Sequence, residues 1–293
     1  MTRTARSLPA AGGEMLESLY QHRLLTSHQL HQMHNPDAGE RWTREVLRRL
    51  RAAQLVEFVR AADGRGSVYF LTRTGASAVE RLTTRPVARR ELVGSAAAAG
   101  PLRAHTLAIN EVGIAFMHTA RAREDDFGAL AWQHEMAYPL GAGRREMLVS
   151  DALLNYLQHG PDGELVFHYR LLELDRATMP VDALAAKLAR YARLYRHKPG
   201  WEARSPVFPG VICVLTGKPQ PVLERRLSTV LALSGEDPEL TSTPEVEVSL
   251  CLLDDLTERG PFASIWQRPD RPDTQVDWLG QSASDSGDRG PVR

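Results

Sequence analysis

The chain is poor in cysteine and contains no long apolar run. Its two cysteines, Cys213 and Cys251, lack the spacing of a metal site, so they predict buried free thiols rather than a disulfide framework or a zinc centre. No segment approaches the roughly 18–20 apolar residues that a membrane helix needs, and residues 1–13 lack the apolar core of a secretory signal. These absences predict a cytoplasmic protein without membrane contact.

The composition that remains is that of an ordinary globular protein, 43% apolar and 25% charged. Its 293 residues suffice for about two domains. The formal net charge of zero hides an asymmetry, because residues 1–103 hold 16 arginines against 9 acidic residues, a net of +7 that the remainder balances. A basic front joined to an acidic remainder is typical of a nucleic-acid-binding module attached to a second domain.

The densest basic segment, Arg41–Gly75, has the order of a winged helix-turn-helix: an arginine-rich helix, a strand, a glycine-rich turn and a second strand. The turn at Asp63–Gly66 is a typical hairpin signal. Thr26 begins a capping box, while Thr43 is expected to cap the arginine-rich helix and Thr74 the closing helix. The whole module is expected over 14–82, with elements near 14–22, 26–33, 44–54, 55–60, 67–71 and 75–82.

Arginine side chains are expected on the outward side of the predicted recognition helix. Val46, Leu47 and Leu50 form its apolar side, which leaves the basic positions facing solvent. Guanidinium groups suit bidentate contacts to phosphates and guanine edges, so the sequence predicts double-stranded DNA as a partner. The candidate DNA-binding residues are Arg41, Arg44, Arg48 and Arg51 on the helix and Arg65 in the wing.

Three histidines, His28, His31 and His34, follow one another at helical spacing before this helix. Such a row suggests metal binding, but no cysteine or glutamate nearby completes a site. We therefore expect them on a solvated helix face.

Residues 104–266 predict a second, α/β domain after a linker at 83–103, which makes the fold class α+β. The periodicity indicates the order helix, three strands, helix, strand, helix, strand. This order is the one found in restriction-endonuclease-like nuclease cores. The tail at 267–293 is rich in Asp, Ser, Gly and Pro, and we expect it to be disordered, as is the lead at 1–13.

An acidic set lies at the strand ends of the second domain. Asp151 ends the second predicted strand, Glu173 and Asp175 end the third, and Lys187 lies on the next helix. In a nuclease core such residues bind Mg²⁺ and activate water, so all four are candidate catalytic residues and the three carboxylates are candidate metal ligands. Glu111 is a further candidate or a solvated helix position. Because Asp175 stands where a nuclease usually has lysine, we favour a retained architecture whose acids are structural or regulatory, with metal chemistry as the alternative.

Four segments share a wider pattern: RWTREVLRRLRAAQLVEFV, HTLAINEVGIAF, SDALL and LLELDRATMPVDALAAKLARYARLY. Together, within about residues 14–215, they resemble the replication-relaxation family of plasmid and mobile-element proteins. The resemblance implies a DNA-binding protein tied to plasmid replication and DNA relaxation. Ser150 stands where the family typically has proline. The positions that match the shared pattern are Asp151, Glu173, Asp175, Arg176, Thr178, Lys187 and Tyr191.

Three functions therefore stay open at the level of sequence. The leading one is a DNA-binding accessory protein of plasmid or mobile-element replication and relaxation, acting on double-stranded DNA. The second is a Mg²⁺- or Mn²⁺-dependent nuclease or nickase, for which alone a cofactor is expected. The third is a transcription regulator whose acidic domain is a dimerisation or effector module. Further partners would be a second copy of the chain or replication and mobilisation proteins.

Overall fold

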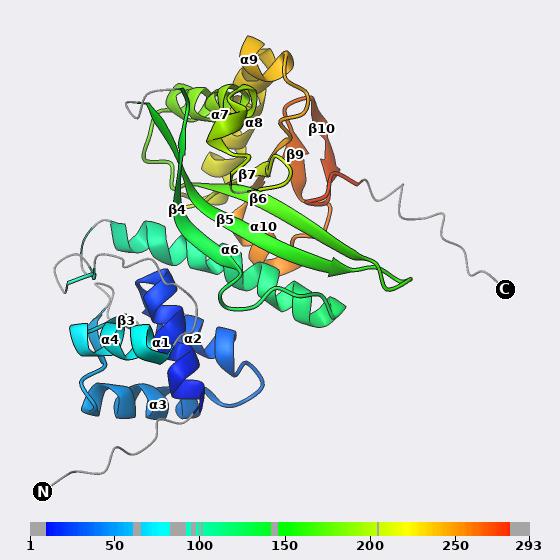
Figure 1. Cartoon of the computed structure of the whole chain (residues 1–293). Coiled ribbons are helices and arrows are strands. Elements are labelled where there is room, and N and C mark those ends of the chain that lie inside the picture. The colour runs from blue at the N-terminus through cyan, green and yellow to red at the C-terminus, as the bar shows by residue number, and fades with distance from the viewer. Residues whose placement is uncertain are drawn as a thin grey trace, which may run out of the picture. The chain divides into compact units, whose positions relative to one another are not determined.

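The structure, a computed structural model, describes residues 10–60, 66–82, 92–94, 98, 100, 102–141, 146–203 and 205–281. The chain divides into two compact units (Figure 1). Unit 1 comprises Met1–Ile114 with Gly128–Leu130, and unit 2 comprises Ala115–Phe127 with Ala131–Arg293. The boundary falls within the long helix α6 (Leu102–Arg123). Both units mix helices and strands, as the α+β prediction requires.

Unit 1 is a winged helix-turn-helix. Its strands form an antiparallel sheet in the order β1-β3-β2, and β2 and β3 are the two strands of the wing. The helices and the two wing strands follow the predicted order, and β1, which the sequence did not predict, is an additional strand paired with β3. The elements are α1 (Ala10–His22), β1 (Leu25–Thr26), α2 (Ser27–His34), α3 (Glu40–Ala52), β2 (Val56–Arg60), β3 (Ser67–Leu71) and α4 (Arg73–Leu82).

The start of α2 was predicted correctly and the start of α3 was not. Thr26 and Gln29 form the expected capping box, each side chain bonded to the other's backbone N–H. Helix α3 begins after Gly39, one turn earlier than expected, because Thr43 does not cap it. Thr43 is fully buried and its hydroxyl lies 3.1 Å from His31 Nδ1, where it joins α3 to α2.

The closing helix α4 is capped by Thr72 rather than by the predicted Thr74. Thr72 Oγ1 accepts a hydrogen bond from Gly75 N at 3.0 Å and donates one to the carbonyl of Gln54 at 2.7 Å. One hydroxyl thus links the segment just after α3 to the start of α4. Gly75 is required here, because a Cβ would lie 2.0 Å from the carbonyl oxygen of Leu55.

The expectation of a solvated histidine face was wrong for two of the three side chains. His31 is buried against Thr43, and His34 is bonded through Nε2 to Ser18 at 2.9 Å. His28 is the exposed member, with Nδ1 3.0 Å from Glu40. Histidines that connect α1, α2 and α3 serve the packing of unit 1.

Unit 2 is built on a seven-stranded mixed sheet with the order β10-β9-β8-β7-β6-β5-β4. Strands β6, β7 and β8 are parallel, and the remaining neighbours are antiparallel. Helices α7 and α8 are the crossovers between the parallel strands and lie on one face of the sheet, with α10 on the other (Figure 1). The structure adds η1, α9, α10, β9 and β10 to the elements that the sequence predicts for this unit. After α6 the elements are β4 (Trp132–Pro139), β5 (Met147–His159), β6 (Leu165–Asp175), α7 (Val181–Arg196), the 3-10 turn η1 (Lys198–Gly200), β7 (Gly210–Leu215), α8 (Gln220–Glu236), α9 (Pro238–Thr241), β8 (Val248–Leu252), α10 (Leu253–Arg259), β9 (Trp266–Arg268) and β10 (Arg271–Val276).

The core of unit 2 lies between the parallel strands and the helices α7 and α8. Every residue of β7 and β8 is buried, as expected for strands covered on both faces. Leu184, Leu188 and Tyr191 of α7 pack into this core. Cys213 and Cys251 are buried free thiols, which confirms their predicted role.

The expectation of a disordered tail from residue 267 is wrong as far as residue 281. Strands β9 and β10 complete the sheet, and Trp278 is buried in an aromatic cluster, with ring centroids 5.1 Å from both Phe116 and Tyr156. Burial of such large rings outweighs the polar composition around them. Residues 282–293, like 1–9 and most of the predicted linker, lie outside the described part. No helix in the described ranges has the length and hydropathy to cross a membrane.

Candidate functional site

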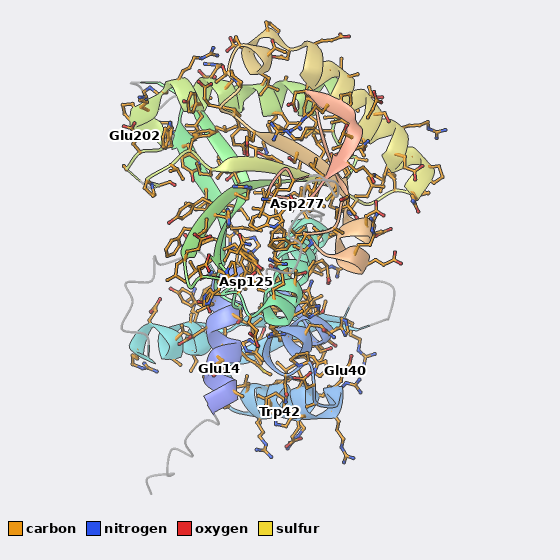
Figure 2. The ribbon with its side chains drawn as sticks, turned by 90° about the vertical axis from the view of Figure 1, so that its right-hand side faces the viewer. Glu14, Glu40, Trp42, Asp125, Glu202 and Asp277 are labelled. Carbon is orange, nitrogen blue, oxygen red and sulfur yellow. The ribbon has the colours of Figure 1, made fainter. Side chains whose placement is uncertain are left out.

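The outward face of α3 carries the basic side chains that the sequence predicts for DNA contact. Thr43, Val46, Leu47 and Leu50 are the buried positions of this helix. At the helical period the remaining positions must face away from the core of unit 1. Figure 2 shows nitrogen-tipped side chains extending outward from the helix that bears Trp42. The side chains of Arg44 and Arg48 are 66% and 68% exposed, and Arg41 is also exposed.

Two glutamates on the same helix hold these arginines in place. Arg44 Nη2 lies 2.5 Å from Glu40, and Arg48 contacts both oxygens of Glu45 at 2.8 Å. Arg49 Nε donates to Glu45 as well, at 2.8 Å. Hydrogen bonds from Arg48 and Arg49 lower the pKa of Glu45 to about 2. Five arginines and two charged glutamates leave α3 a net charge of +3.

These ion pairs are easily exchanged. Exposed pairs at helical spacing contribute little to stability, so a phosphate can replace a carboxylate at little cost. The sequence interpretation missed Arg49 and Trp42 as members of this face. The signal for Arg49 was available, since it stands four residues after Glu45, the spacing of a helical ion pair. Trp42 is 37% exposed.

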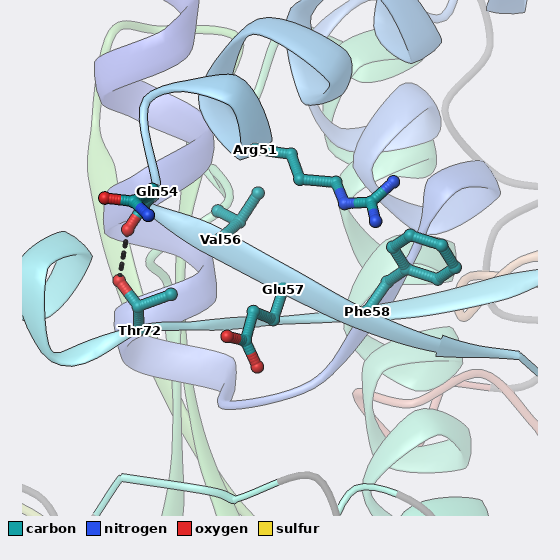
Figure 3. Close-up of a pocket in the computed structure, with 6 residues that line it drawn as sticks. All are labelled: Arg51, Gln54, Val56, Glu57, Phe58 and Thr72. Atoms are coloured by element: carbon teal, nitrogen blue, oxygen red, sulfur yellow. Dashed lines mark hydrogen bonds between the residues drawn. The ribbon is translucent and has the colours of Figure 1, made fainter.

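Arg51 is directed toward the wing. Its guanidinium carbon lies 4.6 Å from the ring centroid of Phe58 in β2, a cation–π contact, and the Phe58 ring lies 5.7 Å from that of Tyr69 in β3. The last turn of α3 and the root of the wing thus form one surface. A hollow of about 340 Å³ opens beside it (Figure 3), lined by Arg51, Gln54, Val56, Glu57, Phe58 and Thr72. The predicted wing contact Arg65 lies outside the described residues.

In unit 2 the structure brings Asp151, Glu173 and Lys187 together. Glu173 is 2% exposed; it accepts a short hydrogen bond from Lys187, and Tyr191 Oη donates to its other oxygen at 2.5 Å. Asp151 Oδ2 accepts the backbone N–H of Leu174 at 2.7 Å, just beyond the last paired residues of β5 and β6. Lys187 on α7 therefore reaches Glu173 near the end of β6, as the sequence suggested.

Asp175, predicted as a third ligand, has a different partner. It is 3% exposed and forms a two-pronged ion pair with Arg226 of α8, and it also accepts the backbone N–H of Ala177 at 3.1 Å. Sequence reasoning gave no signal for Arg226. Glu111 is elsewhere, bonded to the side chain of Gln29 in unit 1.

The three predicted metal ligands do not fit Mg²⁺ in this arrangement. Over the ranges the structure describes, no three His, Cys, Asp or Glu side chains form a group that could hold a metal ion. The carboxylate oxygens of Glu173 and Asp175 are already engaged by protein cations. Each of these two buried acidic groups is thus paired with a basic side chain near the end of β6.

Glu173 has an unusual proton affinity. Burial, and then the nearby charge of Asp151, raises the pKa of Glu173 to about 8 against the opposing effect of Lys187. Burial alone would lower the pKa of Lys187, but the carboxylates of Glu173 and Asp151 more than compensate and raise it. The Glu173 carboxyl therefore keeps its proton to a higher pH than an ordinary glutamate does.

This proton affinity predicts how stability depends on pH. Since the folded-state pKa of Glu173 is raised from 4.5 to about 8, its contribution to stability is complete below about pH 4.5 and is lost as the pH rises toward 8. Glu173→Gln is expected to flatten that decline. Urea midpoints of both proteins at about pH 5 and pH 8.5 measure it, and identical declines would contradict the shift.

The fold and the surface define the class of the protein: a winged-helix protein with an arginine-rich third helix, joined to a mixed-sheet unit. More particularly, the chain belongs to the replication-relaxation family, whose sequence profile matches residues 16–211. Membership of this family and the winged-helix fold fit a DNA-binding role.

Solved winged-helix structures share a short part of the chain. A mutant of MarR from E. coli is 25% identical over 26% of this chain and 54% of that one, with a TM-score of 0.24. A mutant of ZitR from Lactococcus lactis is 15% identical over 28% of this chain and 54% of that one, with a TM-score of 0.23. The chain thus spans about half the length of these structures. Among curated proteins, none matches it.

Proposed function

We propose that the protein binds duplex DNA through its winged helix and acts in the replication or relaxation of plasmid or mobile-element DNA. Helix α3 lies in a major groove, where Arg41, Arg44 and Arg48 contact phosphates and base edges. Arg51 and the wing residue Arg65 contact the flanking backbone. Membership of the replication-relaxation family supports a role in replication or relaxation, and the exposed arginines of α3 support its contact with DNA.

The observation that carries this proposal is the division of α3 into two faces. Thr43, Val46, Leu47 and Leu50 are buried in unit 1, whereas its arginines are exposed. A helix of this kind presents up to five guanidinium groups to a partner, and each is a donor suited to phosphate or to guanine.

Fluorescence anisotropy of a labelled duplex with the full chain tests the proposal. Counterion release predicts an affinity that falls steeply between about 50 and 200 mM salt, with a slope set by the number of phosphates contacted. The DNA sequence that the protein prefers is found by selecting bound duplexes from a random pool over repeated rounds of binding. Absence of saturable binding at about 50 mM salt would contradict the function.

A second candidate is a metal-dependent nicking activity. One observation favours it: Asp151, which lies within β5 and not at its predicted end, is close to Glu173 near the end of β6 and to Lys187 of α7, although these carboxyl groups already have protein partners. No step of such a reaction follows from this geometry.

Conversion of supercoiled plasmid to the nicked form decides this candidate. A nicked product that appears with Mg²⁺ or Mn²⁺, and that is lost both with EDTA and in Asp151→Ala, would establish the activity. Equal amounts of product from the unmodified chain and from Asp151→Ala would rule it out. Asp162→Ala, a change in an exposed turn residue, is the matched control.

A further inference from the structure

A cavity of about 140 Å³ lies in unit 2, bordered by the end of α8, by α9, by the start of β8 and by the turn after β9. These elements can be followed in Figure 1. An apolar cavity of about 150 Å³ holds one benzene molecule, so the occupant of this one has roughly six to eight non-hydrogen atoms. One wall forms because α8 comes close to the turn: a Cβ on Gly235 would lie 2.9 Å from the carbonyl oxygen of Pro269.

The cavity has a buried floor and is open to solvent on one side. Its floor consists of the four buried lining residues, Ser234 of α8, Leu240 of α9, Val246 before β8 and Val248 at the start of β8. Thr241, Pro244 and Asp270 also line the cavity and are exposed. A small molecule can therefore enter past these three residues and reach an apolar floor.

The hydroxyl of Ser234 is the polar group of this floor. Ser234 is 1% exposed, and its Oγ has no hydrogen-bond partner in the part of the chain that the structure describes. A helical serine commonly donates to the carbonyl four residues earlier, as Ser228 of the same helix does to Glu224 at 3.1 Å. A buried polar group without a partner is unfavourable and rare. The hydroxyl is thus available, as donor and acceptor, to a molecule in the cavity.

The charge beside the cavity is already balanced. Arg268 of β9 lines the wall, where its Nε donates to Asp270 at 3.0 Å and its Nη1 lies 3.6 Å from Glu247. An anionic ligand would compete with these two carboxylates for Arg268, and a cationic ligand would meet the guanidinium. Either charge would also be unfavourable against the apolar floor. The lining therefore favours an uncharged molecule.

We propose that this cavity binds a small uncharged ligand that has an apolar body of about six carbon atoms and one hydroxyl or carbonyl group. The apolar body lies against Leu240, Val246 and Val248, and the polar group forms a hydrogen bond with Ser234. A mostly apolar lining with a placed polar group is the usual composition of a small-molecule site. A water molecule is a poorer occupant, because it needs two to four polar partners and the other floor side chains are apolar. The site lies within unit 2 and can be tested without DNA.

Fluorine NMR titrations of the full chain with three probes test the proposal. 4-Fluorophenol, which is uncharged at pH 7, is expected to bind with a dissociation constant of about 0.1–1 mM, as suits so few atoms. Fluorobenzene lacks the hydroxyl and should bind about 3- to 10-fold more weakly. 4-Fluorobenzoate should show no saturable binding. Absence of saturable 4-fluorophenol binding, or equal binding of 4-fluorobenzoate, would overturn the proposal.

Ser234→Ala locates the site. It should weaken binding of 4-fluorophenol by about 3- to 10-fold and leave that of fluorobenzene unchanged, because it removes the hydroxyl and keeps the apolar floor. Ser228→Ala is the matched control, since it makes the same change on the same helix at an exposed serine that already has a partner. Equal 4-fluorophenol affinity in Ser234→Ala and the unmodified chain would show that the probe binds elsewhere.

Urea midpoints without ligand test whether the Ser234 hydroxyl is unsatisfied. Ser234→Ala is expected to be at least as stable as Ser228→Ala, because it removes a buried hydroxyl that has no partner, and the gain in helix propensity is the same in both. Saturating 4-fluorophenol should raise the midpoint of the unmodified chain more than that of Ser234→Ala. A lower midpoint for Ser234→Ala alone would show that a bound water already satisfies the hydroxyl, and it would overturn the proposal.

Discussion

Replacing Arg44 and Arg48 together with alanine is expected to weaken duplex binding by roughly 10- to 100-fold at about 100 mM salt. Each arginine lost from the outward face of α3 removes a contact with a phosphate or a base edge. If both contact phosphates, the slope of affinity against salt should also fall by about 2. Anisotropy titrations at several salt concentrations measure both quantities.

The fold is expected to survive this change. Both side chains are exposed, their ion pairs contribute little, and alanine is at least as good a helix former as arginine. Arg81→Ala removes an exposed arginine from α4 and is the control within unit 1. Unchanged affinity and salt slope in the double variant would show that α3 is not the recognition helix.

Glu45→Gln sharpens the same test in the opposite direction. Glu45 neutralises Arg48 and Arg49, so its loss should free two guanidinium groups and strengthen binding several-fold. A face that does not touch DNA would give no such gain.

Replacing Arg226 with leucine is expected to lower the stability of unit 2 by about 3 to 5 kcal/mol. Asp175 is 3% exposed, and the change leaves its carboxylate buried without its cation. Urea unfolding followed by circular dichroism measures the shift in midpoint. The second change Asp175→Asn, made in the Arg226→Leu background, should restore much of the loss, because the uncompensated charge is then absent.

Arg193→Leu is the matched control for this experiment. Its ion pair with Glu146 is exposed on both sides, so its loss should lower the stability far less than the loss of the buried pair. Equal losses from Arg226→Leu and Arg193→Leu would contradict the importance assigned to the buried pair.

Local sequence rules predicted unit 1 well because its elements are short and their signals lie close together. The capping box at Thr26 and the strand Ser67–Leu71 follow from residues within a few positions. The errors came where a side chain had a tertiary role instead of a local one. Thr43 has the chemistry of a cap, but it is buried against His31.

The candidate site in unit 2 was predictable only in part. The closeness of Asp151 and Glu173 follows because they lie on antiparallel strands joined by one hairpin. The closeness of Lys187 follows because it lies on the next helix. The partner of Asp175 could not be predicted, because Arg226 is 51 residues away and reaches it only through the order of the parallel strands. The ordered segment up to residue 281 was missed for the same reason, since Trp278 is buried by Phe116 and Tyr156.

Trp42 has a consequence of a different kind. It is the only tryptophan of unit 1, it lies on α3, and it is 37% exposed. Buried indoles emit at shorter wavelengths and are poorly reached by dissolved iodide, so the red-shifted, quenchable part of the fluorescence comes from this single residue. The chain thus carries an optical reporter on its recognition helix, and anything that covers α3 should be visible without a label. The four buried tryptophans are Trp132, Trp201, Trp266 and Trp278.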